Sequence, residues 1–171
     1  MNQDNPFAAP EADITPQVRV EKRKKSPLAD RGTRFVASLV DGIVNMLYGL
    51  PILYAFGFFD YLGRQEQLPF GRLAACGILS YLAFIAVHGY FLYKKGQTLG
   101  KLATGIRIAD LNGKVPNFGK VLLLRYLPIN LCAFIPLVGT FLPLVDVLFI
   151  FREDRRCLHD LLAGTKVVKT K

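Results

Sequence analysis

The chain has 171 residues, carries a net charge of +9 and is 51% hydrophobic. Three apolar runs, at 35–59, 73–93 and 121–151, argue against an ordinary soluble domain, because each is long enough to cross a bilayer. The charge does not indicate nucleic-acid binding, because 19 of the 22 basic residues flank these runs in three clusters and no interleaved aromatic set accompanies them.

The first 30 residues are polar and contain four prolines. They lack the apolar core of a cleavable signal peptide, so they predict a disordered cytoplasmic tail, followed by a membrane domain at 31–171. The basic sequence Lys22-Arg23-Lys24-Lys25 lies near the end of this tail. We interpret it as a topology signal beside anionic headgroups, in preference to a site of specific lipid recognition.

The first apolar run predicts a membrane helix at 35–59. Asp41 is the only ionisable residue in this run, and Arg34 stands directly before it. A carboxylate within a membrane span is energetically expensive and usually marks an ion-paired or functional site.

The second run predicts a helix at 73–93, with His88 five residues before its end. The segment after it, Gly96-Gln97-Thr98-Leu99-Gly100-Lys101, resembles a phosphate-binding loop. Its spacing is wrong by one residue, Leu102 replaces the Ser or Thr that binds magnesium, and no strand precedes it. We therefore reject nucleotide binding and expect a tight exit from the helix, with Lys101 at the headgroups.

The third run is too long for one crossing, since a single helix would measure about 46 Å against a hydrocarbon core of ~30 Å. The sequence Pro136-Leu137-Val138-Gly139-Thr140 within it predicts a turn. Two short helices at 121–136 and 140–151 would return Arg152 to the cytoplasm, as the positive-inside rule requires. We predict an all-α membrane fold of four helices, the last two a short hairpin, with both termini cytoplasmic. Three spans with an external C-terminal tail are the alternative.

The segments 105–110 and 114–116, joined by an Asn-Gly turn, predict a small cytoplasmic β-hairpin. The tail at 164–169 predicts a third strand, because a lone hairpin is only marginally stable in water. A faint internal repeat is also present, since Leu102–Ile108 resembles Leu161–Val167. A duplicated unit and coincidence account for the repeat equally well.

Four polar residues, Asp41, His88, Arg125 and Asp146, lie four to six residues from the cytoplasmic ends of their predicted helices. At 1.5 Å per residue, this spacing predicts one polar layer about 6–9 Å below the inner surface, with Arg125 bridging at least one carboxylate. The layer is either a structural ion-pair cluster, which we prefer, or a site where a carboxylate loads and releases a cation or proton.

Catalytic and metal-binding patterns do not emerge from the sequence. There is no set of nucleophile, base and orienting group, and no second histidine or cysteine completes a metal set around His159. The three cysteines have neither disulfide-framework nor zinc spacing. We therefore predict no enzyme activity, no metal site and no cofactor.

A set of short motifs runs in order from about residue 28 to residue 169. It comprises Arg34, Asp41, Gly96-Gln97-Thr98-Leu99-Gly100-Lys101, Arg125, and His159-Asp160-Leu161-Leu162-Ala163-Gly164-Thr165 followed by Val167-Val168. This set resembles the RDD family, bacterial and archaeal membrane proteins named for one arginine and two aspartates. Arg34 and Asp41 fit the arginine and the first aspartate, and Asp160 fits the second better than Asp146 does. The resemblance implies a multi-pass protein of the bacterial inner membrane, and sodium/proton exchange has been ascribed to some members.

Two functions remain open. One is transport of a monovalent cation or proton by a homo-oligomer, because four short helices make a thin wall for a monomeric path. The other is a non-transport scaffold or accessory subunit that binds a protein partner through its cytoplasmic face. We further predict that Asp160 is a partly exposed structural pin at the inner surface, lying among Lys101, Arg107 and Lys166.

Overall fold

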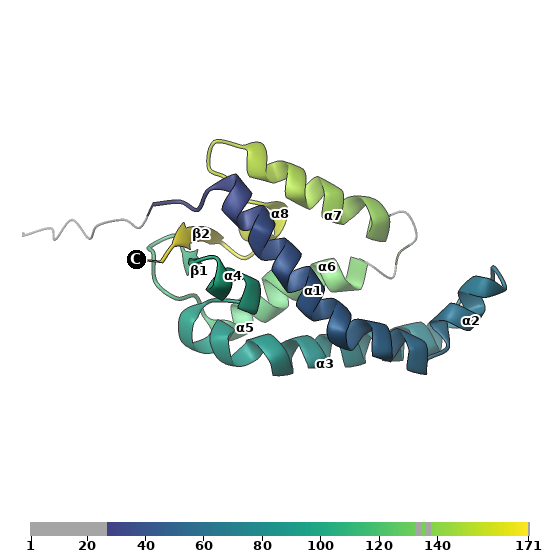
Figure 1. Ribbon diagram of the computed structural model, residues 1–171. Coiled ribbons are helices and arrows are strands. Elements are labelled where there is room, and N and C mark those ends of the chain that lie inside the picture. Colours follow the sequence, from purple (N-terminus) through teal and green to yellow (C-terminus); the bar gives the residue numbers. More distant parts are fainter. Residues whose placement is uncertain (1–26, 133–134, 136–137, 171) are drawn as a thin grey trace, which may run out of the picture.

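The computed structural model describes residues 27–132, 135 and 138–170. Most of the predicted N-terminal tail and part of the predicted turn around Pro136 lie outside these residues. In Figure 1, a small sheet and several short helices gather at one end of a set of longer helices.

Two long helices dominate the described chain: α1, at Arg31–Ala55, and α3, at Phe70–Lys95. The predicted first helix continued to Phe59, which is wrong, because Gly57 adopts a left-handed φ of 73° and ends the helix. A separate short helix, α2, follows at Phe58–Gly63.

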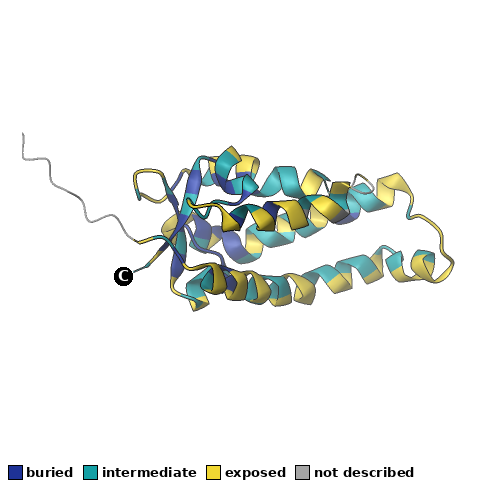
Figure 2. Ribbon diagram, turned by 90° about the horizontal axis from the view of Figure 1, so that it is seen from above, coloured by how far each residue is buried: buried dark blue, intermediate teal, exposed yellow. Residues whose placement is uncertain are grey.

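Both long helices are apolar and long enough to cross a membrane, and only 6% of the apolar window of each is buried within the protein. A core helix of a soluble protein would bury most of that surface. In Figure 2, exposed residues follow the lengths of the helices, whereas buried residues gather at the end that holds the sheet. The outward apolar surface therefore matches a lipid environment.

The third apolar run forms short helical pieces. Residues 118–132 are continuously helical through α5 (Phe118–Lys120), the π-helix η1 (Val121–Tyr126) and α6 (Leu127–Cys132). After the predicted turn come α7 (Val138–Leu148) and the 3₁₀ turn η2 (Phe149–Phe151). The two stretches contact each other, and each measures only about 20 Å at 1.5 Å per residue. Neither reaches spanning length alone, so the four-helix membrane topology stays a prediction.

The sheet has two antiparallel strands, β1 (Ile106–Asp110) and β2 (Thr165–Lys169), with Ile106 opposite Lys169. The predicted strand at 114–116 is absent from the sheet of the described chain, although the Asn-Gly turn forms. Its backbone is held by Asp110, whose N–H donates to the Lys114 carbonyl at 2.9 Å and whose Oδ1 accepts from the Lys114 N–H at 2.7 Å. The predicted strand of the tail is β2, and Leu28 forms a single bridge to Val168 at the other edge of β2.

A short helix precedes each strand: α4 (Leu99–Ala103) before β1 and α8 (Leu158–Leu162) before β2. A glycine with positive φ, Gly105 at 66° and Gly164 at 60°, joins helix to strand in each case. The repeat suggested by the sequence is thus matched by two similar helix–glycine–strand units, whose strands pair with each other.

The core lies between this sheet and the membrane helices. One buried cluster contains Ala29, Ala37, Ile106 and Val167, so it joins α1 to both strands. A second contains Leu92, Ile108 and Val121, which join α3 and η1 to β1. These contacts fix the position of the polar residues described next.

Candidate functional site

A buried ion cluster, here called the Asp160 cluster, consists of Arg34 on α1, Arg125 on η1, Asp160 on α8 and Thr165 on β2. Arg34 Nη2 lies 2.7 Å from Asp160 Oδ2, and Arg125 Nη1 donates to Asp160 Oδ1. The Thr165 hydroxyl donates to Asp160 Oδ1 at 3.0 Å and accepts from Arg125 Nη1 at 2.8 Å. The side chains of Asp160, Arg125 and Arg34 are 0%, 2% and 8% exposed, so one carboxylate holds together two membrane-proximal helices and the sheet.

Asp160 is ionised in this environment. Burial alone would raise its pKa, but the charges of Arg125 and Arg34 outweigh that effect and hold the pKa well below the usual range. The same carboxylate also caps its own helix, because Oδ2 accepts from the Cys157 N–H at 3.2 Å.

Arg125 lies in the π-helical segment. Its partner helix α8 contacts η1 directly, and the hydroxyl of Tyr81 on α3 donates to the Leu122 carbonyl of η1 at 2.9 Å. A π-turn widens the helix and is frequent where a side chain must be presented at a functional or strained position. Here it accompanies the placement of a fully buried arginine against Asp160.

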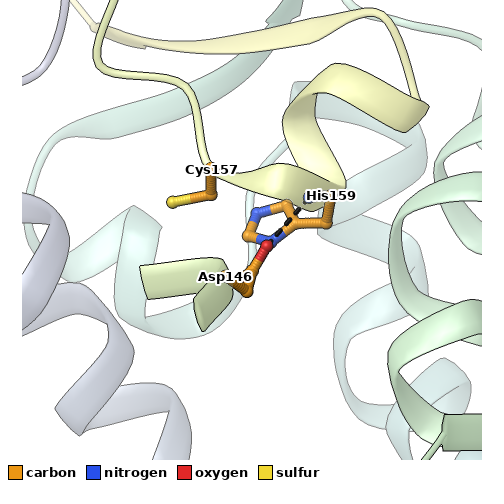
Figure 3. Close-up of side chains that lie close together, drawn as sticks. All are labelled: Asp146, Cys157 and His159. Carbon is orange, nitrogen blue, oxygen red and sulfur yellow. Dashed lines mark hydrogen bonds and ion pairs between the residues drawn. The ribbon is translucent and has the colours of Figure 1, made fainter. Parts of the chain in front are cut away.

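A second carboxylate, Asp146 on α7, binds His159. Its Oδ2 lies 2.6 Å from His159 Nδ1, and its Oδ1 accepts from the His159 N–H at 2.8 Å. Figure 3 shows these two side chains facing each other, with Cys157 nearby. Burial, followed by the charge of Arg125, lowers the pKa of His159 despite the bond to Asp146, so the imidazole is neutral at pH 7.

Asp146, Cys157 and His159 offer ligand atoms within 4.8 Å of one another, which raises the question of a metal. Their surroundings argue against one. Burial raises the pKa of the Cys157 thiol to about 11, and Arg34 Nη2 already lies 3.2 Å from its sulfur. A cation at this site would lie beside the Arg34 guanidinium, and both Asp146 oxygens are already bonded to His159. The trio fits a hydrogen-bonded network.

Asp41 forms a separate group, the Asp41 cluster, with Thr98, Gly100 and Lys101. Its Oδ1 accepts from the Gly100 N–H at 2.7 Å, and its Oδ2 accepts from the Thr98 hydroxyl at 2.5 Å and lies 3.3 Å from Lys101 Nζ. The carboxylate therefore caps the start of α4 from the neighbouring helix α1. The Asp41 and Lys101 side chains are 15% and 12% exposed, so this pair is more accessible than the Asp160 cluster.

The two glycines of the predicted tight exit, Gly96 and Gly100, have different roles. A Cβ at Gly100 would overlap the Ala37 carbonyl oxygen and lie 2.8 Å from Asp41 Oδ1. Glycine is needed here because α1 and α4 approach too closely for any side chain. Gly96, with its φ of 66°, turns the chain out of α3, and its carbonyl accepts from the Ile108 N–H at 2.8 Å.

His88, on α3, contacts the loop between α3 and α4. It is fully buried, and its Nδ1 accepts from the Leu99 N–H at 3.2 Å. Its ring contacts Phe84 at a centroid distance of 4.9 Å. His88 is thus a hydrogen-bonded interior residue, as the sequence favoured over a ligand-binding role.

The single predicted polar layer divides into two clusters. Asp41 and His88 join the loop after α3, whereas Arg125 and Asp146 join the segment around α8. Arg125 binds a carboxylate, as predicted, but that carboxylate is Asp160, which was not part of the predicted layer.

The predicted environment of Asp160 is also wrong. Arg107 and Lys166, expected beside it, donate to the carbonyls of Gly113 and Leu111, and Lys101 binds Asp41. Asp160 is fully buried because α8 packs against both β2 and η1. The sequence showed Asp160 and Arg125 as charged residues, but no local pattern indicated their pairing, which joins positions 35 residues apart.

Comparison with known proteins identifies the family. Residues 28–164 match the model of the RDD family. The chain belongs to the RDD family. It is also 29% identical over 144 residues to an uncharacterized protein of Haemophilus influenzae, an alignment that covers 82% of this chain and 78% of that protein. No solved structure matches the chain.

The ion pairs distinguish the two residues that the sequence offered as the second RDD aspartate. Arg34 forms its ion pair with Asp160, whereas Asp146 binds His159. Asp41, the residue expected as the first aspartate, holds the loop that follows α3.

Proposed function

We propose that this RDD protein is a scaffold of the bacterial inner membrane, whose cytoplasmic unit of β1, β2, α4 and α8 is held rigidly on the membrane helices and presented to a protein partner. The observation that carries this proposal is the Asp160 cluster. A carboxylate with two arginine partners and no exposure has the properties of a fixed structural joint.

The other carboxylates support the same conclusion. Asp41 accepts three polar contacts, including one from Lys101, and Asp146 is bound through both oxygens to His159. A transport carboxylate must exchange its proton or ion during each cycle. Groups that already hold tightly bonded partners favour a structural role.

Contacts at the helix ends support four membrane helices with both termini cytoplasmic. Arg31 Nε and Nη2 donate to the carbonyls of Ile150 and Phe151 at 3.2 Å each, so the end of η2 lies at the start of α1. The Tyr93 and Phe118 rings lie 5.9 Å apart, so α5 starts where α3 ends. A hairpin at 118–151 that leaves and returns on one side accounts for both contacts.

Cysteine labelling tests this topology. In a background without the three native cysteines, a membrane-impermeant maleimide added outside should label Gln65→Cys and miss Lys169→Cys. Both positions are exposed, so accessibility does not decide the result. Labelling of position 169 from outside would establish the three-span alternative.

Site-specific photocrosslinking in cells tests the scaffold role. Leu111, in the turn after β1, is 56% exposed and offers an apolar contact on the cytoplasmic unit. A photoreactive residue at position 111 should give one discrete adduct with another protein, and a photoreactive residue at Gln65 should not. Asp160→Asn should abolish the adduct, whereas Glu153→Gln, an exposed carboxylate-to-amide change in the same region, should keep it. Equal crosslinking at both positions would contradict a dedicated partner surface.

Cation or proton transport by a homo-oligomer is the second candidate, and the Asp41–Lys101 pair favours it. This pair is partly exposed, and lysine is a single-point counter-ion that an incoming cation could replace more easily than a doubly bonded arginine. A proteoliposome assay of sodium/proton flux separates the two functions. The scaffold proposal expects no flux above empty liposomes, whereas flux that is lost in Asp41→Asn would establish transport.

A further inference from the structure

A cleft lies at the cytoplasmic end of α3, away from both carboxylate clusters. It has a volume of about 470 Å³ and is lined by Tyr93 and Lys94 at the end of α3 and by residues 115–119, which lead from the turn after β1 into α5. The lining combines apolar walls, from Tyr93, Val115 and Phe118, with the polar groups of Lys94 and Asn117.

The two segments that line this cleft contain no carboxylate, and Asp110, in the turn before residue 115, accepts through Oδ1 from the Lys114 N–H at 2.7 Å. No Asp or Glu occurs between Gln67 and Ala109 or between Leu111 and Val145, so both lining segments carry only cationic side chains. Lys94 and Lys120 are exposed and form no ion pair with any carboxylate of the described chain. Lys94 Nζ lies 5.5 Å from the centre of the Tyr93 ring, at the mouth of the cleft.

Asn117 leaves a second donor available. Its Oδ1 accepts from the Lys120 N–H at 3.1 Å, and its side-chain NH₂ donates to no atom of the described chain. A lysine ammonium and an amide NH₂ beside an apolar wall are suited to a group that is anionic at one end and apolar at the other.

We propose that this cleft binds an anionic phospholipid of the inner leaflet, with the phosphate at Lys94 and Asn117 and the glycerol and first acyl carbons along Tyr93 and Phe118. The inference rests on the membrane placement proposed above, which sets the end of α3 at the inner headgroup level. Tyr93 is 62% exposed at this level, where tyrosine rings are enriched in membrane proteins. A free phosphate would use the lysine and the amide but not the apolar wall.

Fluorescence quenching in reconstituted protein tests the proposal. The chain has no tryptophan, so Tyr93→Trp in the full-length protein places a single reporter in the cleft. Phosphatidylglycerol with brominated acyl chains should quench this reporter more strongly than brominated phosphatidylcholine in the same vesicles. Adding Lys94→Gln should lower the preference for phosphatidylglycerol about fivefold, because it removes a direct and partly exposed ion pair that contributes up to about 1 kcal/mol.

Lys95→Gln provides the matched control, because Lys95 is the next residue, carries the same charge and does not line the cleft. It should leave the preference unchanged, and an equal loss in both variants would overturn the proposal in favour of diffuse attraction.

Displacement of the brominated lipid by millimolar inorganic phosphate would show a site for a soluble anion and would also overturn the proposal. Native mass spectrometry of the wild type, which should retain one phosphatidylglycerol, checks that the tryptophan has not created the site. The crosslink at position 111 should survive in Lys94→Gln, so the lipid inference and the scaffold proposal can fail separately.

Discussion

Replacing Asp160 by asparagine should open the unit formed by β1, β2, α4 and α8. The change keeps the shape of the side chain but leaves Arg34 and Arg125 facing each other without a carboxylate in a site that is at most 8% exposed. Removing one partner of a buried ion pair costs about 3–5 kcal/mol. Because a tenfold change in an equilibrium constant corresponds to about 1.4 kcal/mol, the open state should become more populated by about two to three and a half orders of magnitude.

Cys157 provides the assay for this opening. Its side chain is 5% exposed and contacts Arg34, so it reacts with a maleimide only when the unit opens. In a background where Cys76 and Cys132 are replaced by alanine, the labelling rate of Cys157 measures opening. The charge of Asp160 raises the pKa of this thiol, so its loss would increase the thiolate fraction as well. Rates should therefore be measured over a range of pH and compared at equal thiolate fraction.

Two variants complete the test. Glu153→Gln, an exposed carboxylate nearby, should leave the rate unchanged. Asp160→Asn combined with Arg125→Gln should label more slowly than the product of the single effects predicts, because the two side chains are in direct contact. A rate for Asp160→Asn within twofold of the wild type would refute the idea that this ion pair holds the unit closed.

Two further predictions concern single residues. Gly100→Ala should lower the melting temperature markedly and separate α4 from α1, because the new Cβ would overlap the Ala37 carbonyl oxygen. Gly32→Ala is the control and should be tolerated, because no atom lies within 4 Å of a Cβ at that position. Equal losses of melting temperature in the two variants would contradict the close approach of α1 and α4. Burial raises the pKa of the Cys157 thiol from 9.0 to about 11, so the unfolded chain loses this proton at a lower pH than the folded protein does. The contribution of the protonated thiol to the unfolding free energy should therefore be constant below pH 9 and should fall by at most about 3 kcal/mol as pH rises to 11. Cys157→Ser should lack this part of the decline in a denaturation series, and an identical decline in both proteins would refute it.

The sequence predicted those features that depend on local chemistry. Two apolar runs predicted α1 and α3, and the glycines after the second run predicted the tight exit that Gly96 provides, whereas the end of α1 before Gly57 was not predicted. The turn at Asn112-Gly113 was predicted correctly, because that dipeptide favours the required backbone. The short strand at 165–169 followed from its β-branched residues.

The pairings between distant residues were not predictable in the same way. Asp160 binds Arg34, 126 positions away, and Asp41 binds Gly100, 59 positions away. Depth counted along each helix placed Asp41 and Arg125 at similar levels, but depth contains no information about which neighbour a side chain faces. That orientation depends on how α4 and α8 fold back, and such tertiary contacts leave no periodic signal in the chain.

The two clusters together suggest why the repeated units need both aspartates. Each helix–glycine–strand unit contributes one strand to a sheet that would be marginal alone, since two strands bury little surface. Asp41 fixes the first unit to α1 through the start of α4, and Asp160, within the second unit, is fixed by arginines from α1 and η1. Because α1 takes part in both attachments, it joins the two units. Movement of α1 relative to η1 would have to break the Arg34–Asp160–Arg125 contact, so the sheet and the inner ends of these helices should move as one body.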